Sequence, residues 1–143
     1  MTIWYEPVDD RHYQFLYDLL KERPKNACIS HKKMPTFKDH VKFVDSFPYK
    51  EWYVIRDGAE MVGSVYLSKQ NEFGMFIKRG FSGRGIARKT FDWMERRHRG
   101  ERLLSNINPK NRRIKRLLKS IGCKLIQETY EHRSRATREA VGG

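Results

Sequence analysis

The sequence has few cysteines, no long apolar run and no internal repeat. Its two cysteines, Cys28 and Cys123, cannot form a disulfide framework. No group of His, Cys and carboxylate residues has the spacing of a metal site, so we expect a reducing compartment and no bound metal. No apolar stretch approaches the roughly 20 residues of a membrane-spanning helix, and nothing resembles a signal peptide. These absences predict a soluble, cytoplasmic protein without a membrane partner.

The charge of this basic protein is unevenly distributed. A chain of 143 residues, 38% hydrophobic and 13% aromatic, is long enough for one domain with a core and too short for two. Residues 1–77 carry 11 Lys or Arg against 11 Asp or Glu, whereas residues 78–143 carry 19 against 6, so the whole net charge of +13 lies in the second half. This asymmetry predicts an anionic partner, either a phosphate-bearing cofactor, a nucleic acid or both. A merely solvated surface is the alternative.

Apolar periodicity predicts a chain of alternating strands and helices. The expected strands are 2–8, 51–57, 60–69, 72–78, 101–107 and 123–131. The expected helices run from the acidic pair at 9–10 to Pro24, from Thr36 to about Phe47, from 86 to 97, and from the segment NPKN to Gly122. This order predicts a three-layer α/β domain, with a mixed, mostly antiparallel sheet flanked by about four helices. We expect that domain to span residues 1–131, and residues 132–143 to form a disordered basic tail.

The segment KRGFSGRGIARKTF, residues 78–91, joins the fourth expected strand to the third helix and holds three glycines. It does not fit the dinucleotide-binding fingerprint, because Arg88 stands in place of the last glycine, nor a P-loop, because Ile86 stands where Lys is required. What remains is a glycine turn before a helix N-terminus, whose unpaired amides and dipole favour an anion. A tight turn with incidental glycines is the alternative.

Within this turn, the segment SGRGIA resembles the pyrophosphate motif of the GNAT family of acyl-CoA-dependent N-acyltransferases, Gln/Arg-x-x-Gly-x-Gly/Ala. Gly85 and Ala87 match the motif, while Ser82 stands where Gln or Arg is usual. The resemblance implies that the anion is the pyrophosphate of acetyl-CoA, the expected cosubstrate.

A second segment, NRRIKRLLKSIGC, resembles the family stretch in which an Asn opens a helix and a Gly-Phe closes it. Asn111 and Gly122 match, and Cys123 stands in the Phe place. The resemblance covers about residues 1–131. It implies that the strands EFGMFIK and RLLSNIN splay apart to admit the pantetheine arm of the cofactor.

The resemblance also implies which residues bind the cofactor. Backbone amides of the turn would hold the pyrophosphate, basic side chains would balance the remaining phosphate charge, and Asn111 would position the pantetheine or the adenosine. The amide of Phe76 or Ile77 would donate a hydrogen bond to the acetyl carbonyl. The full implied set is Phe76, Ile77, Arg79, Ser82, Gly83, Arg84, Gly85, Ile86, Ala87, Arg88, Lys89 and Asn111.

Direct acetyl transfer, as the resemblance implies, requires the acceptor amine to lose a proton. Glu72 begins the fourth strand, where family members often carry a carboxylate that deprotonates the amine through water; a solvated strand-end carboxylate is the alternative. His31, in the loop between the first two helices, is a second candidate for binding or deprotonating the acceptor, with an ordinary exposed loop histidine as the alternative. The family's usual tyrosine acid is replaced by Leu118, so no side chain there can protonate the leaving thiolate.

Two functions are expected, one implied by the resemblance and one indicated by the charge. The first is an N-acetyltransferase that moves an acetyl group from acetyl-CoA to a primary amine of a small molecule, such as an amino sugar or polyamine. The second is a nucleic-acid-binding protein, or a modifier of a nucleic-acid-borne amine, because the expected helix from Arg112 to Lys119 is strongly basic and the charge exceeds what one CoA needs. We expect a monomer or a homodimer.

Overall fold

The computed structural model describes residues 1–23 and 33–134. Its elements, in chain order, are β1 (Ile3–Pro7), the 3-10 helix η1 (Asp10–His12), α1 (Tyr13–Glu22), α2 (Phe37–Asp45), β2 (Glu51–Asp57), β3 (Glu60–Leu67), β4 (Glu72–Ile77), α3 (Ile86–Arg97), β5 (Leu104–Ser105) and α4 (Arg112–Ser120). No helix in the described part of the chain is long and apolar enough to cross a membrane.

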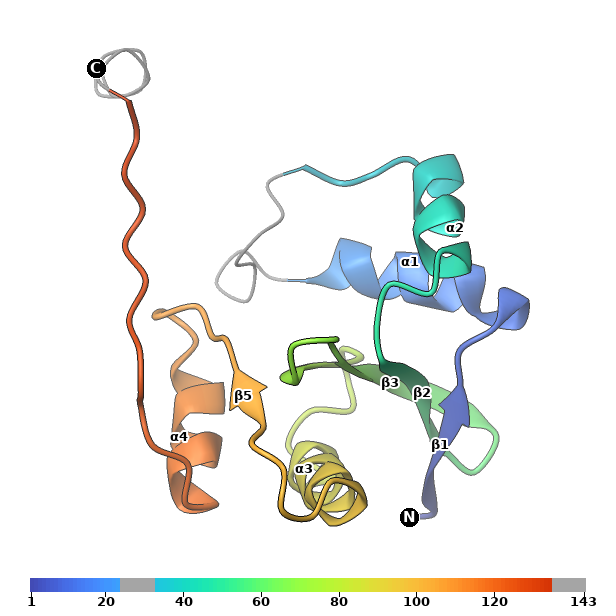
Figure 1. Ribbon diagram of the computed structural model, residues 1–143. Coiled ribbons are helices and arrows are strands. Elements are labelled where there is room, and N and C mark those ends of the chain that lie inside the picture. Colours follow the sequence, from blue (N-terminus) through green and yellow to red (C-terminus); the bar gives the residue numbers. More distant parts are fainter. Residues whose placement is uncertain (24–32, 135–143) are drawn as a thin grey trace.

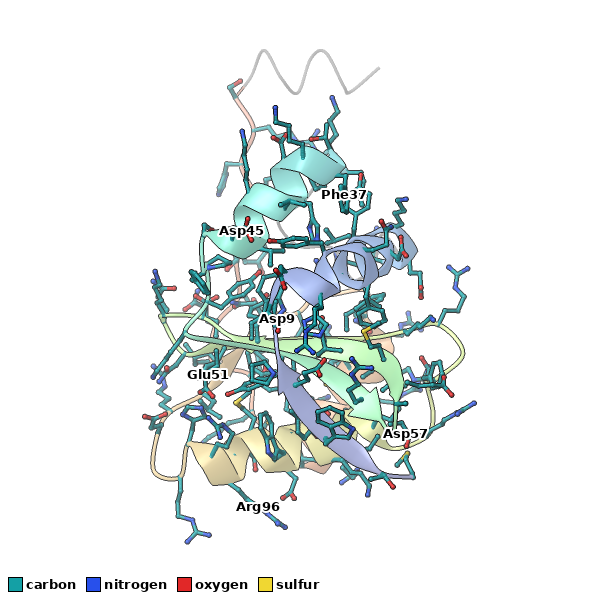
Figure 2. All side chains as sticks on the ribbon, turned by 90° about the vertical axis from the view of Figure 1, so that its right-hand side faces the viewer. Asp9, Phe37, Asp45, Glu51, Asp57 and Arg96 are labelled. Carbon is teal, nitrogen blue, oxygen red and sulfur yellow. The ribbon has the colours of Figure 1, made fainter. Side chains whose placement is uncertain are left out.

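The five strands form one sheet in the order β1-β2-β3-β4-β5. Strands β1 to β4 are antiparallel neighbours, and β5 runs parallel to β4. Figures 1 and 2 show α1 and α2 on one face of the sheet and α3 on the other. This arrangement confirms the predicted three-layer α/β fold with a mixed, mostly antiparallel sheet.

Two apolar clusters hold the layers together. Leu16 and Leu19 of α1 pack with Val44 of α2 and Val54 of β2 on one face. On the other face, inward residues of β2, β3 and β4 pack against α3 and α4, with members Ile55, Val62, Val65, Leu67, Phe73, Ile86, Phe91, Met94 and Leu118. Alternate strand residues therefore serve opposite layers, as the period of two in a pleated strand requires.

Several predicted boundaries are confirmed because local capping chemistry sets them. The Thr36 side chain accepts a hydrogen bond from the Asp39 amide at 3.1 Å and begins α2. Asn111 caps α4 in the same way, through the Ile114 amide at 3.3 Å. Strand β2 and helix α3 have the predicted bounds, and Gly122, with a φ of +90°, follows the end of α4.

Two predicted strands are wrong. The fifth covers only Leu104–Ser105 rather than residues 101–107, because its pairing with β4 stops there. The segment 123–131 forms no strand: it runs away from the sheet beyond α4 (Figure 1), and Leu125 and Tyr130 are 79% and 75% exposed. Its β-branched and aromatic composition gives strand propensity, but a strand also needs a neighbouring edge to pair with.

Candidate active site

The central feature of the site is a gap between β4 and β5. The two strands pair only at Glu72 with Leu104 and at Phe73 with Ser105, while β4 continues beside β3 as far as Ile77. We call this gap the β4–β5 wedge: it is closed at the Phe73–Ser105 pair and opens toward the C-terminal end of β4. The end of pairing at Phe73–Ser105 is the point from which the splay implied by the sequence resemblance would open.

The backbone of β4 directs particular amides into the wedge. The Ser68 amide donates to the Glu72 carbonyl at 2.8 Å, and the Lys78 amide donates to Val62 at 2.8 Å, so even-numbered residues of β4 bond toward β3. Because bonding direction alternates along an antiparallel strand, the Phe76 amide faces β3 and the Ile77 amide faces the wedge. The hydrogen-bond pattern between β3 and β4 therefore favours Ile77 over Phe76 as the predicted oxyanion donor.

The glycine turn lies at the open end of the wedge and leads into α3. Gly83 and Gly85 have φ values of +79° and +80°, in the left-handed region that glycine tolerates best. Gly85 caps α3 without any side-chain hydrogen bond, and the first turn of the helix contains no acidic residue. Residues 82–85 are exposed. The start of α3 thus has no side-chain cap and no acidic residue to compete with an anion, as an anion site requires.

Basic side chains lie near this turn, and one of them, Arg113, was not among those expected from the sequence. The Arg113 guanidinium, on α4, lies 3.2 Å from the position that a Cβ on Gly83 would occupy. Arg84 lies over the Phe81 ring, with its Cζ 4.8 Å from the ring centre. Arg88 instead donates to the Ser120 hydroxyl at 2.8 Å, at the far end of α4. Arg113 was missed because its approach depends on how α4 packs.

An acidic side chain already meets the start of the turn. The Arg79 amide donates to the Glu22 carboxylate at 2.7 Å, which joins the end of α1 to the end of β4. The Arg79 side chain itself is exposed. One backbone amide at the start of the turn is therefore already bonded to a carboxylate.

Glu72 lies at the closed end of the wedge. It is partly buried, and its carboxylate accepts a hydrogen bond from the Asn106 side-chain amide, just beyond β5. Sequence analysis missed Asn106, because only the parallel pairing of β4 with β5 brings it there. His31, the other predicted catalytic residue, lies outside the described residues. Leu118 is 8% exposed within the core cluster, so its position offers no acid.

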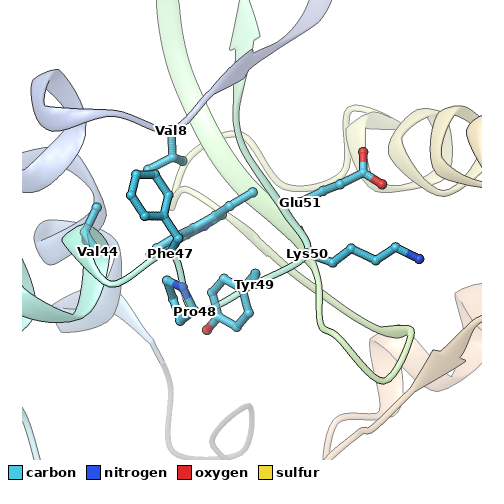
Figure 3. Close-up of a pocket in the computed structure, with 8 residues that line it drawn as sticks. Val8, Val44, Phe47, Pro48, Tyr49, Lys50 and Glu51 are labelled. Carbon is cyan, nitrogen blue, oxygen red and sulfur yellow. The ribbon is translucent and has the colours of Figure 1, made fainter.

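A small cavity of about 130 Å³ lies between the end of α2 and the start of β2 (Figure 3). Val44, Phe47 and Trp52 contribute to its lining, whereas the Lys50 and Glu51 side chains extend away from these groups. The buried indole Nε1 of Trp52 has no hydrogen-bond acceptor among the described residues. The cavity thus lies on the face of the sheet that α1 and α2 cover, with Val44, Phe47 and Trp52 in its apolar wall.

A separate ionic cluster joins β2 to the C-terminal end of α3. Glu51 accepts hydrogen bonds from the Arg97 guanidinium at 2.7 and 3.0 Å and from the Tyr53 hydroxyl at 2.5 Å, and it contacts the His98 ring. Burial acts to raise the pKa of Glu51, but the bonds from Tyr53 and Arg97 outweigh it and leave the pKa below its ordinary value. Burial and the Glu51 charge raise the pKa of Tyr53 to about 12. Glu51, Arg97 and Tyr53 satisfy one another, which is typical of a structural cluster.

No protein-family model matches this sequence, and no curated protein matches it. Solved structures do match. An aminoglycoside N-acetyltransferase, AAC(6')-Iy in complex with CoA, is 14% identical over 93% of this chain and 95% of that chain, with a TM-score of 0.69. RimL, a ribosomal L7/L12 alpha-N-protein acetyltransferase in complex with coenzyme A, is 16% identical over 89% and 82%, with a TM-score of 0.71.

A third solved structure, the spermidine/spermine N-acetyltransferase SpeG from Vibrio cholerae, is 16% identical over 92% of this chain and 87% of that chain, with a TM-score of 0.69. The chain has the GNAT fold. This result confirms the fold implied by the two sequence motifs. The three GNAT-fold enzymes act on an aminoglycoside, a protein N-terminus and polyamines, so the fold alone does not select an acceptor.

Proposed function

We propose that the protein is an acetyl-CoA-dependent N-acetyltransferase that acts on a primary amine of a small molecule, such as an amino sugar or a polyamine. The observation that carries this proposal is the β4–β5 wedge, which leads from an exposed, uncapped helix N-terminus to the Ile77 amide and the Glu72 carboxylate. Structural neighbours that hold CoA support it.

The glycine turn would bind the pyrophosphate. Amides of residues 82–87 would donate to the phosphate oxygens, and the dipole of α3 would add to the attraction. Arg84 and Arg113 lie at the turn, where they would neutralise phosphate charge. Arg88 would contribute only after releasing Ser120.

The wedge would receive the pantetheine arm and bring the thioester beside β4. There the Ile77 amide would donate to the carbonyl oxygen, where negative charge develops during attack. Glu72 would accept a proton from the acceptor ammonium, through a bridging water, and the Asn106 amide would hold the carboxylate in place. His31 remains a second predicted base on the acceptor side.

A second candidate function is nucleic-acid binding through α4. Arg112, Arg116 and Lys119 follow one helical stripe, are exposed, and form no ion pair within the described residues. An unpaired cationic stripe fits a phosphate backbone. A solvated helix end, whose basic residues complement the helix dipole, is the simpler explanation of Lys119.

Calorimetry with two acetyl donors tests the proposed function. Acetyl-CoA should bind with heat and raise the melting temperature of the protein. Acetyl-pantetheine has the same thioester and arm but no pyrophosphate or adenosine, and it should bind at least ~100-fold more weakly if the helix N-terminus supplies two charge-assisted hydrogen bonds. Thiol release with a panel of polyamines and amino sugars would then find the acceptor. Absence of acetyl-CoA binding, or equal binding of both donors, would contradict the proposal.

A further inference from the structure

The side chain of Tyr66, on β3, lies directly across the backbone of β4. A Cβ built on Gly74 would overlap the Cζ, Cε1 and hydroxyl oxygen of the Tyr66 ring. Gly74 therefore lets the phenol rest on the strand, with the hydroxyl above the β4 backbone rather than above β3. Any larger residue at position 74 would displace this hydroxyl.

Gly74 is also the first residue of β4 inside the wedge. The preceding residue, Phe73, makes the last pair with β5, at Ser105. An arm that enters the wedge from the glycine turn must stop at this pair, because backbone pairing closes the gap beyond it. The reactive end of the arm would thus come to rest beside Gly74, under the Tyr66 hydroxyl.

The neighbouring Tyr49 holds the Tyr66 ring in this position. The two rings stack with centroids 3.9 Å apart and an interplanar angle of 9°. Burial, together with the adjacent Tyr66 hydroxyl, raises the pKa of Tyr49. The Tyr49 phenol therefore stays neutral. The positive charge of Arg23 acts in the opposite direction on Tyr49.

The proposed reaction needs a proton donor that the core position of Leu118 cannot supply. We propose that Tyr66 is a catalytic residue that donates its phenolic proton to the CoA sulfur as the thioester breaks, an inference that rests on the proposed function. The amine nitrogen bonds to the carbonyl carbon, the carbon–sulfur bond breaks, and its electron pair goes to sulfur, which takes the Tyr66 proton. Glu72 takes the proton that the ammonium loses, and Tyr66 regains one from solvent.

The test uses free CoA and therefore needs no known acceptor. A donor hydrogen bond from Tyr66 stabilises the bound thiolate and lowers the pKa of the CoA thiol, which lies near 8.5 for an unperturbed thiol. The ultraviolet absorbance of the thiolate measures this pKa in the complex. In the Tyr66→Phe variant, which keeps the ring over Gly74, the pKa of the bound thiol should rise by about one unit relative to the parent protein.

Tyr5→Phe is the matched control, because the Tyr5 hydroxyl donates to Thr90 on the opposite face of the sheet. It should leave the thiol pKa of bound CoA unchanged. An equal thiol pKa in the parent protein and in Tyr66→Phe, with CoA bound to both, would overturn this proposal alone. Failure of the parent protein to bind CoA would overturn the proposed function and this inference together.

Discussion

The two edges of β4 differ in how far their polar groups are satisfied. On the side toward β3, hydrogen bonds continue along the whole strand. We call this the closed side, and we include in it the ionic cluster of Glu51, Arg97 and His98, which joins β2 to the C-terminal end of α3. On the open side, formed by the β4–β5 wedge and the start of α3, pairing stops at Phe73 and the first helical turn has no side-chain cap. Helix α3 thus has a C-terminal end held by ionic contacts with Glu51 and an N-terminal end without a side-chain cap.

This difference indicates where stability and binding reside. Unpaired amides and uncapped helix ends contribute little to folding, but they are available to a ligand. Paired, partly buried charges are costly to disrupt and leave nothing free for a ligand. Substitutions on the open side should therefore change activity or affinity, and substitutions on the closed side should change the free energy of unfolding.

The largest effect is expected at Glu72, which lies where the β4–β5 wedge ends. Glu72→Gln keeps the size of the side chain and removes its basicity, so once an acceptor is known kcat should fall ~100-fold to 10,000-fold near neutral pH. The Kd for acetyl-CoA, measured by calorimetry, should stay nearly constant. Part of the loss should be recovered at higher pH, where more amine is already neutral. An unchanged kcat and pH profile would make Glu72 an ordinary strand-end residue.

Glycines at the two ends of α3 provide a direct test of the comparison. Gly85 and Gly100 both have left-handed φ values, +80° and +83°, and at neither glycine does any neighbouring atom lie within 4 Å of the position that a Cβ would occupy. Glu at either position should cost ~1–2 kcal/mol of backbone strain. Only Gly85→Glu puts a carboxylate at the proposed pyrophosphate site, and it should weaken acetyl-CoA binding ~100-fold or more, whereas Gly100→Glu should not. Equal Kd values for both variants in calorimetry would refute the assignment of the turn.

On the closed side, Glu51→Gln should reduce stability without affecting binding. Loss of charge-assisted hydrogen bonds to Arg97 should lower the free energy of unfolding by ~1–3 kcal/mol in urea denaturation. Because the folded-state pKa of Glu51 lies below its ordinary value of 4.5, the stabilisation is present above that value and is lost as the pH falls through the folded-state pKa. Parent and variant should therefore converge in stability in acid. A constant difference down to low pH would show that the Glu51 charge is not responsible.

The smallest effect is expected from the basic stripe of α4. If nucleic acid binds there, changing Arg112, Arg116 and Lys119 to Gln should reduce the slope of log K against log salt by about 2.7, from three lost phosphate contacts. Arg113 is left intact because it approaches Gly83. The charge-matched control replaces Lys33, Lys38 and Lys42. Equal salt slopes for the two triple variants in DNA-binding titrations would exclude α4 as the interface.

Features that depend on neighbouring residues in sequence were predicted well. The caps at Thr36 and Asn111 and the turn around Gly85 rest on local chemistry, and their positions agree with the structure. The predicted strand 123–131 was wrong, because propensity says nothing about whether a partner edge is near. The position of His31 stays a prediction.

Contacts across the sheet could not be predicted in the same way. Asn106 reaches Glu72 only because β5 is parallel to β4, and Tyr66 covers Gly74 only because of the β3–β4 register. Arg113 approaches Gly83 through the packing of α4, although α3 and β5 lie between the two residues in the sequence. The site residues that sequence analysis missed are those brought together by strand pairing or by helix packing rather than by spacing along the chain.

The extended segment after Gly122 should differ from the core in the rate at which its amide protons exchange with water. Within the described residues, amides 124–130 have no hydrogen-bond acceptor, so their protons are free to exchange with water without any unfolding step. Amides of the β2–β3 ladder exchange only when the domain opens, at a cost of ~5–15 kcal/mol for a typical domain. The amide exchange rates of residues 124–130 should therefore exceed those of the core strands by many orders of magnitude. The boundary between fast and slow exchange falls at Gly122, the residue with a left-handed φ that follows α4.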